Sequence, residues 1–320
     1  MSHVFGPIQS RRLGRSMGID LVPHKTCNWN CVYCQLGRTI PLTNERRQYR
    51  STQTVLSDFR RALHECREKV DWITFVGSGE PTLHIDLGHL IREIKDLTDI
   101  AVAVITNGSL LWDVDVEGEV AMADAVLPSL DAGDEAIYRA INRPHPDLTY
   151  DSLVRGLRGF RRYYKGKLWV EVMLVADMND TEPALLDLAK ALHDISPDEV
   201  HISTPFHATA EHWVRQPTAE ATALAQAILG EKAKVLAPVS ADVNLDKDRA
   251  AEAIADVITR HPLPEDEVRA TFAGCLQDAN EGVQRLGATG TLQRVYREGR
   301  WFWCPAGATY ADAHVKKEKK

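Results

Sequence analysis

The stretch CNWNCVYC, residues 27–34, decides how this sequence is interpreted. It holds three of the chain's six cysteines, spaced as Cys27-x3-Cys31-x2-Cys34. By chance, two further cysteines would fall at fixed distances from a given one about 4 times in 10,000. A small oxidised scaffold would spread its cysteines along a short chain, whereas this chain has 320 residues. The cluster therefore favours a metal site over disulfides.

Three thiolates on one loop are one ligand short of a closed metal site. Structural zinc takes four ligands, and a closed four-iron cluster takes four cysteines. His24, just before the triplet, could complete a Cys3His zinc site. A four-iron cluster held by Cys27, Cys31 and Cys34 instead leaves one iron open to a small molecule, which is the arrangement of a catalytic cluster.

Length and composition are those of a globular protein of about two domains. Hydrophobic residues make up 44% and charged residues 26% of the chain, which excludes disordered, collagenous and fibrous proteins. Charges interrupt the apolar runs well short of the ~18 residues that a membrane span needs. No basic segment followed by an apolar one opens the chain, so we see no secretory signal. We expect a cytoplasmic protein with no membrane partner.

Charge is distributed unevenly along the chain. The formal net charge is -7, yet residues 1–50 carry +6 and the remaining 270 residues carry -13. A basic segment on an acidic body is typical of a site for an anionic ligand or nucleic acid, and it is equally typical of a solvated surface.

Strand-like and helix-like segments alternate over the first two-thirds of the chain. Strand-length apolar runs lie at Gly18–Val22, Trp72–Val76, Ala101–Ile105, Ala125–Leu130, Leu168–Val175 and Val200–Ser203. Helical periodicity separates them, which predicts an α/β fold with parallel strands. Glycine or small polar residues stand at the carboxyl end of every predicted strand, and in a barrel these ends share one rim. We predict a partial (β/α)6 barrel over residues 1–245, because the chain has too few strands for eight units.

The pattern changes from about Asp246. We expect helices over Leu245–Arg260, Glu265–Thr271 and Ala279–Leu286, and strands over Thr291–Tyr296 and Arg300–Cys304. Three helices and a hairpin predict a small winged-helix-like domain over residues 246–310, followed by a disordered charged tail over 311–320. Residues 246–320 carry 12 basic and 12 acidic side chains, so charge does not favour DNA over a protein partner.

Several motifs together resemble the radical S-adenosylmethionine (SAM) superfamily. The cysteine spacing, with aromatic Tyr33 before the third cysteine, looks like the signature of that family. Ser78-Gly79-Glu80-Pro81 resembles its second-strand motif, which binds the amino group of SAM. Residues that fall where the family contacts ribose, carboxylate and adenine are Thr106, Asn107, Ser129, Asp131 and Met173. The match covers roughly residues 15–210, and the triplet followed by the Gly-Glu-Pro segment is specific.

The resemblance implies a function and its cofactors. One 4Fe-4S cluster per chain, ligated by Cys27, Cys31 and Cys34, would bind SAM at its open iron. Reductive cleavage of SAM would yield a 5′-deoxyadenosyl radical that abstracts hydrogen from a substrate enclosed by the barrel. An external one-electron donor such as flavodoxin or ferredoxin is expected. No second cysteine triplet exists, so an auxiliary cluster is not expected.

Each assignment has a structural alternative. Asn107-Gly108 could be a simple turn, and Asp131 could be the N-cap of a helix over Glu135–Ile141. Met173 could be a core residue, as Cys66 on the apolar face of a helix is expected to be. Cys275 and Cys304 are isolated in the sequence.

The N-terminal segment FGPIQSRRLGRSMGID, residues 5–20, resembles one radical SAM subgroup. That subgroup is related to enzymes that make the tricyclic wyosine base of tRNA. The wyosine enzyme needs cysteines for a second cluster, and this chain lacks them, so wyosine-type chemistry is not expected.

The sequence leaves the substrate open. Arg11, Arg12 and Arg15 could meet the phosphates of RNA, and the neutral C-terminal domain could dock a protein or peptide. We rank RNA or a protein slightly above an anionic metabolite. A different class of function is a non-catalytic iron–sulfur redox sensor with a nucleic-acid-binding winged helix, but a sensor needs no SAM pocket.

Overall fold

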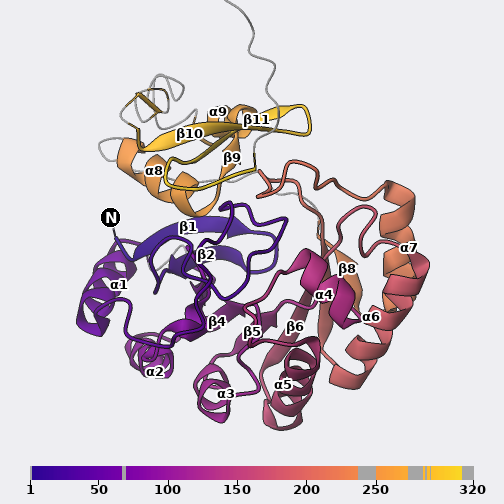
Figure 1. Ribbon diagram of the computed structural model, residues 1–320. Helices are drawn as coiled ribbons and strands as arrows, with labels where there is room; N and C mark the ends of the chain where they lie inside the picture. The colour runs from indigo at the N-terminus through magenta and orange to yellow at the C-terminus, as the bar shows by residue number, and fades with distance from the viewer. Residues whose placement is uncertain are drawn as a thin grey trace, which may run out of the picture.

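The computed structural model describes residues 2–66, 70–236, 250–272 and 290–311, with isolated positions between 284 and 288. In these residues the main sheet has eight strands that pair in sequence order, as Figure 1 shows. They are β1 (Val4–Ser10), β2 (Gly14–Ile19), β3 (Trp72–Phe75), β4 (Ala101–Thr106), β5 (Ala125–Pro128), β6 (Lys167–Met173), β7 (Glu199–Ser203) and β8 (Ala233–Val235).

Strand direction defines an α/β fold. β1 pairs with β2 antiparallel, and every later neighbour in the sheet pairs parallel. Helices connect the parallel strands and cover the outer face of the sheet (Figure 1). They are α1 (Thr52–Cys66), the 3-10 helix η2 (Pro81–Leu83), α2 (Leu87–Leu97), α3 (Val114–Val120), α4 (Glu135–Ile141), α5 (Tyr150–Tyr163), α6 (Glu182–Ile195) and α7 (Ala219–Leu229). The predicted α/β class is confirmed.

The sheet curves as a partial barrel does. β1 and β8 form its two edges and do not pair with each other. Arg12, in the turn between β1 and β2, makes an ion pair with Glu171 of β6, so the first hairpin meets the sixth strand across the inner face. Residues on the outer face of β6, such as Val170, are fully buried against the helices, whereas Glu171 keeps partial exposure.

Six strands lie at or near the predicted ranges, and two strands were missed. The first predicted strand, Gly18–Val22, is β2 at Gly14–Ile19. β1 contains Gly6-Pro7, and its pairing shifts register between Phe5 and Ile8, which hides the alternation typical of a strand. β8 has only three residues. Among the helices described, none is long and apolar enough to cross a membrane.

A second unit lies against β1 (Figure 1). It contains α8 (Ala250–Arg260), β9 (Leu263–Pro264), α9 (Glu265–Phe272), β10 (Leu292–Arg297) and β11 (Arg300–Pro305), and its sheet has the order β10-β11-β9. We call these elements the C-terminal unit. The first two predicted helices and both predicted strands are present, and β9 was not predicted.

Parts of the C-terminal prediction fall outside the described residues. The expected helix over Ala279–Leu286 lies mostly there, as do Cys275 and residues 312–320 of the expected tail. The winged-helix assignment and the domain boundaries at 245/246 and 310/311 therefore stay predictions. Cys304 is buried in a small core with Phe302 and Ala208, which joins β11 to the segment after β7.

Candidate functional site

The cysteine loop follows β2, at the carboxyl edge of the sheet. Cys27, Cys31 and Cys34 are free thiols with partial exposure. The loop folds tightly, since the N–H of Cys34 donates to the carbonyl of Cys31 at 3.1 Å. Cys27 and Cys31 also pack against the main core. The three sulfurs predicted as cluster ligands therefore lie on one short, anchored segment.

Lys25 places a partly buried cation beside the loop. Its Nζ lies 3.0 Å from Cys34 Sγ, and its backbone adopts a positive φ of 60°. Burial disfavours the charge on Lys25, but the sulfurs of Cys34 and Cys27 outweigh it and raise its pKa. Burial also raises the pKa of Cys27 to about 12, so a nearby cation or a metal is needed to hold it as a thiolate. The sequence interpretation missed Lys25, although a basic residue two positions before the triplet was a visible signal.

Two asparagines supply donors to the other thiols. Asn107 Nδ2 lies 3.8 Å from Cys27 Sγ, and Asn142 Nδ2 lies 3.7 Å from Cys31 Sγ. Asn107 was expected as a SAM contact, whereas Asn142 was not singled out. Donors to ligating sulfurs tune the charge and potential of an iron–sulfur cluster.

This donor set fits a four-iron cluster. Three thiols share one loop, and each has an N–H donor within hydrogen-bonding range of its sulfur. In the part of the chain that the structure describes, no three His, Cys, Asp or Glu side chains surround a single-ion position. A cluster needs no such point, because each cysteine binds a different iron.

Glu80 ties two strand ends together behind the cysteine loop. Its Oε1 accepts from Thr82 N–H at 3.0 Å, from Thr82 Oγ1 at 2.6 Å and from Thr106 Oγ1 at 2.6 Å. Its Oε2 accepts from Asn107 N–H at 2.8 Å. Burial raises the pKa of Glu80, and these four donors oppose that shift. Among the described contacts Oε2 takes one hydrogen bond, so it keeps acceptor capacity for an ammonium group.

The loop that carries Glu80 requires glycine. A Cβ on Gly79 would lie 1.9 Å from the carbonyl oxygen of Thr26, in the segment that leads into the cysteine loop. The N–H of Glu80 donates to the same oxygen at 2.9 Å. The Gly-Glu-Pro segment and the cysteine loop are therefore in direct backbone contact.

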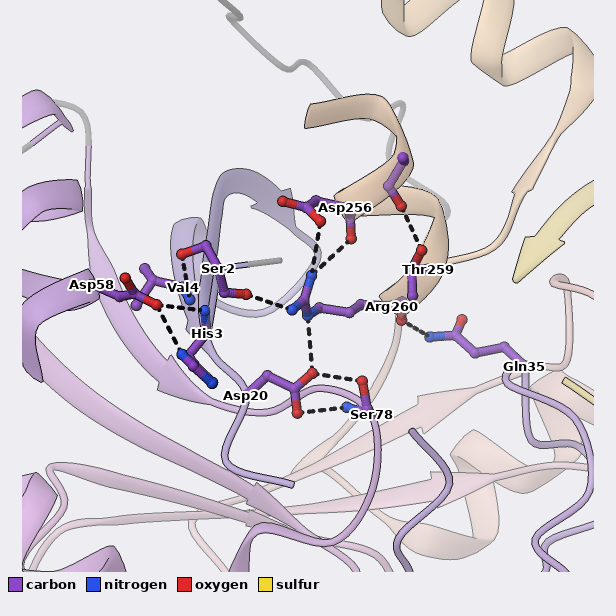
Figure 2. Close-up of polar contacts among 11 residues, drawn as sticks. Ser2, His3, Val4, Asp20, Gln35, Asp58, Ser78, Asp256, Thr259 and Arg260 are labelled. Atoms are coloured by element: carbon purple, nitrogen blue, oxygen red, sulfur yellow. Dashed lines mark hydrogen bonds and ion pairs between the residues drawn. The ribbon is translucent and has the colours of Figure 1, made fainter. Parts of the chain in front are cut away.

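Ser78 is hydrogen-bonded to Asp20, which forms a buried ion pair with Arg260 of the C-terminal unit. Its Oγ donates to Asp20 Oδ2 at 2.5 Å, and its N–H donates to Asp20 Oδ1 at 3.0 Å. Arg260, at the end of α8, donates from Nε to the same Asp20 Oδ2 at 2.9 Å and from Nη2 to the carbonyl of Ser2 at 2.7 Å. Figure 2 shows Arg260 reaching from α8 to Asp20, with Ser78 on the other side of the carboxylate.

The C-terminal unit also touches the end of the cysteine loop. Gln35 follows Cys34, and its carbonyl accepts from Tyr310 Oη at 2.6 Å. Gln35 Nε2 lies 3.4 Å from the carbonyl of Arg260 (Figure 2). The Arg38 N–H donates to the carbonyl of Thr309 at 2.6 Å. Both motif loops are thus bound by the same distant part of the chain.

Asp131 lies inside the site rather than at a helix end. It accepts from Tyr33 Oη at 2.5 Å, from Asn142 Nδ2 at 2.6 Å and from Met173 N–H at 2.8 Å. Burial raises its pKa to about 6. The N-cap of α4 is Asp134, whose side chain accepts from a helix N–H, so the capping alternative for Asp131 is wrong. The cap lies three residues further along because it must reach the free N–H groups of the first turn.

The other predicted SAM residues lie at neighbouring strand ends. Thr106 ends β4, and the N–H of Ser129, just after β5, donates to its carbonyl at 3.1 Å. Ser129 also bridges to Glu171 of β6. Met173 ends β6, and its side chain packs against a buried apolar cluster with Val32, as the core alternative expected. The geometry brings the predicted residues to one edge of the sheet; their individual contacts with SAM stay predictions.

The basic N-terminal segment is largely neutralised by acidic partners. Arg15 pairs with exposed Asp71 at 3.1 Å, and Arg12 pairs with Glu171. Arg11 makes no ion pair with the residues described. Two of the three arginines that could meet a polyanion are therefore already paired with carboxylates.

A cysteine triplet lies beside the Glu80 hub at the carboxyl edge of a curved parallel sheet, where an iron–sulfur enzyme of this fold would hold its cofactors. The model of the radical SAM superfamily matches residues 21–189. The chain belongs to that superfamily and is a radical SAM enzyme, and membership implies SAM and a 4Fe-4S cluster as cofactors.

The proteins that are similar to this chain match it over different lengths. UPF0026 protein MJ1312 of Methanocaldococcus jannaschii is 36% identical over 275 residues, which cover 84% of this chain and 85% of the relative. A Brachyspira hyodysenteriae protein named GTPase Obg is 45% identical over 207 residues, 65% of this chain; the chain spans only 30% of that relative's length. A radical SAM methyltransferase from Sphaerobacter thermophilus has a similar fold, with a TM-score of 0.50 and 17% identity over 69% of this chain and 66% of that one.

Proposed function

We propose that this protein holds one 4Fe-4S cluster per chain on Cys27, Cys31 and Cys34 and uses SAM to abstract hydrogen from a substrate inside the barrel. The observation that carries this proposal is the direct contact of two loops. Glu80 donates its N–H to the backbone that leads into the cysteine loop, while its carboxylate keeps one oxygen with spare acceptor capacity. An amino acid bound at that oxygen would lie beside the thiols.

The cluster, when bound, supplies the electron for reductive cleavage of SAM. The chain's own residues do the positioning. Glu80 would accept hydrogen bonds from the SAM amino group, and Asn107, fixed by its N–H to Glu80, would orient toward the ribose. Asp131 accepts hydrogen bonds from Tyr33 and from the N–H of Met173, and so holds both groups in place. The curved sheet and its helices limit the access of water to a reactive radical.

An external one-electron donor such as flavodoxin or ferredoxin is part of the proposal. The sequence has no second cysteine triplet to relay electrons. Partial exposure of the three ligating cysteines is compatible with electron delivery from outside. A cytoplasmic location, where such donors are found, also remains a proposal.

For the substrate, RNA or a protein remains the proposed class. Arg12 and Arg15 already form ion pairs with carboxylates. Their charges therefore give less support to an RNA substrate than the sequence alone suggested. The C-terminal unit contributes to the cofactor site, so a second role in docking a protein chain needs its own evidence. The redox-sensor alternative has no support from the comparisons, which match enzymes.

Anaerobic incubation with SAM and a strong reductant tests the proposal. The wild-type protein should hold about four irons per chain and form 5′-deoxyadenosine. Cys31→Ala should lose both, while Cys66→Ala should keep both because Cys66 packs on the core at the end of α1. Iron retained in Cys31→Ala, or no 5′-deoxyadenosine from iron-loaded wild type, would contradict the proposal.

A further inference from the structure

Arg11 presents a partly buried guanidinium that makes no ion pair with the residues described. It lies in the turn between β1 and β2, and its guanidinium carbon is 4.0 Å from the centre of the Phe206 ring. Its Nη1 is shielded from solvent and makes no hydrogen bond with the residues described. Burial, together with the charge of neighbouring Arg12, lowers its pKa to about 10, so Arg11 remains a cation at pH 7. A buried, unmatched charge costs free energy and calls for a partner.

The carboxylate that acts on Arg11 is already engaged. Glu171 makes an ion pair with Arg12 and accepts from Ser203 Oγ at 2.9 Å. Arg12 Nε is itself shielded from solvent and unpaired within the described chain. Two guanidiniums thus face one carboxylate, which leaves one positive charge and at least two N–H donors for a ligand.

Two histidines extend this cluster without adding charge. The rings of His207 and His261 meet edge to face, with centroids 4.5 Å apart, and the His207 ring also lies 4.1 Å from that of Phe206. Burial lowers the pKa of His261 to about 4 and that of His207 far below its usual value. Neutral imidazoles can donate to an oxyanion as well as accept from its hydroxyl.

The cluster faces the inside of the barrel, next to the predicted SAM residues. Along β6, Leu168, Val170 and Val172 are fully buried, whereas Glu171 and its inward neighbours keep partial exposure, so solvent reaches the inner face. The Glu171 carbonyl accepts from Leu130 N–H at 2.9 Å, between Ser129 and Asp131. The arginines that face Glu171 therefore lie close to the strand ends that carry the predicted SAM residues.

We propose, building on the proposed function, that Arg11 with Arg12 binds one oxyanionic group of the substrate, a phosphate or a carboxylate, inside the barrel. Phe206 packs against the Arg11 guanidinium. The neutral rings of His207 and His261 line the site and add no charge to it. A bound anion would neutralise the positive charge that Glu171 alone leaves on the two arginines. The substrate class is therefore a molecule with at least one phosphate or carboxylate.

Anion binding to the anaerobic holoenzyme tests this. Inorganic phosphate and acetate are titrated separately into wild type, Arg11→Gln and Arg15→Gln. Arg15 belongs to the same hairpin but is exposed and paired with Asp71, so its variant is the matched control. Wild type and Arg15→Gln should bind alike, and Arg11→Gln should bind about tenfold to a hundredfold more weakly, as the loss of a charge-assisted hydrogen bond requires. Preference for phosphate over acetate identifies a phosphorylated substrate, and the reverse preference identifies a carboxylate.

A second measurement separates a ligand site from a structural role. With no anion present, Arg11→Gln should unfold at a higher temperature than wild type, because an unmatched buried charge has been removed. A structural arginine would give the opposite result. No binding of either anion by wild type, equal affinity in Arg11→Gln, or destabilisation by that change overturns the proposal. SAM cleavage without substrate is measured in parallel, so failure of the proposed function would be seen separately.

Discussion

Arg260 is expected to stabilise both the fold and the SAM pocket, and Arg260→Met tests this. The Arg260 and Asp20 side chains are only 7% and 6% exposed, and their ion pair is 2.9 Å long. The same guanidinium donates to the carbonyl of Ser2 and lies over the Phe5 ring at 4.9 Å. Removing one partner of a buried pair costs about 3–5 kcal/mol, a large part of a total stability of roughly 5–15 kcal/mol.

The matched control is Arg300→Met. Arg300 also belongs to the C-terminal unit and also pairs with an aspartate, Asp266 at 2.7 Å, but its side chain is 43% exposed. An exposed pair contributes about 0–1 kcal/mol, so urea denaturation should separate the two variants clearly. A double variant with Asp20→Asn should lose less than the sum of the single losses, because no buried carboxylate is then left unpaired.

The same variants report on the SAM pocket. Asp20 holds both the N–H and the hydroxyl of Ser78, so loss of Arg260 should loosen the loop that carries Glu80. We expect the Kd for SAM, measured by equilibrium dialysis, to rise about tenfold in Arg260→Met while the iron content stays unchanged. A tenfold rise corresponds to about 1.4 kcal/mol of binding free energy, lost because the loop is less ordered. Equal stability losses in the two methionine variants, or an unchanged Kd for SAM, would refute the reasoning.

Three further predictions concern single residues. Glu80→Gln should weaken SAM binding and keep the cluster, since the carboxylate of Glu80 accepts its hydrogen bonds from Thr82, Thr106 and Asn107; iron loss on anaerobic iron analysis would contradict this. Gly79→Ala should abolish SAM binding because its Cβ would collide with a backbone oxygen, whereas Gly118→Ala, in open space on α3, should raise stability by about 0.5–1 kcal/mol. His261 has a folded pKa of about 4 against roughly 6.5 unfolded, so the unfolded state binds more protons between these values and stability falls as pH drops from about 6.5 to 4. His261→Asn should reduce the slope of that part of the profile in denaturation measurements, while His207 keeps a contribution of the same sign, and an unchanged slope would contradict the prediction.

Local pattern was enough to predict the edge of the sheet where the site lies. Runs such as Trp72–Phe75 and Ala101–Thr106 combine apolar strands with small polar residues at their carboxyl ends, and these signals are contained in a few consecutive residues. Parallel pairing then brings the ends together. The cysteine triplet and the Gly-Glu-Pro segment meet for that reason.

Contacts that cross the chain escaped sequence reasoning. Arg260 is 240 residues from Asp20, and no periodicity links them. Asn142 was not singled out, because its approach to Cys31 depends on how α4 ends against the cysteine loop. Arg12 and Arg15 looked like parts of one basic surface because their partners lie on or just before later strands. Arg12 meets Glu171 of β6 across the sheet, and Arg15 meets Asp71 just before the neighbouring β3.

The hydrogen bond from Tyr310 to Gln35 joins residues 275 positions apart. At synthesis rates of roughly 5–20 residues per second, the ribosome makes the second partner on the order of 15–60 seconds after the first. During that interval the three thiols have left the ribosome without the segment that later covers the end of their loop. Loading of iron and sulfide is therefore expected to follow synthesis of the C-terminal unit. Oxygen that reaches the nascent chain would meet these cysteines at their least protected stage.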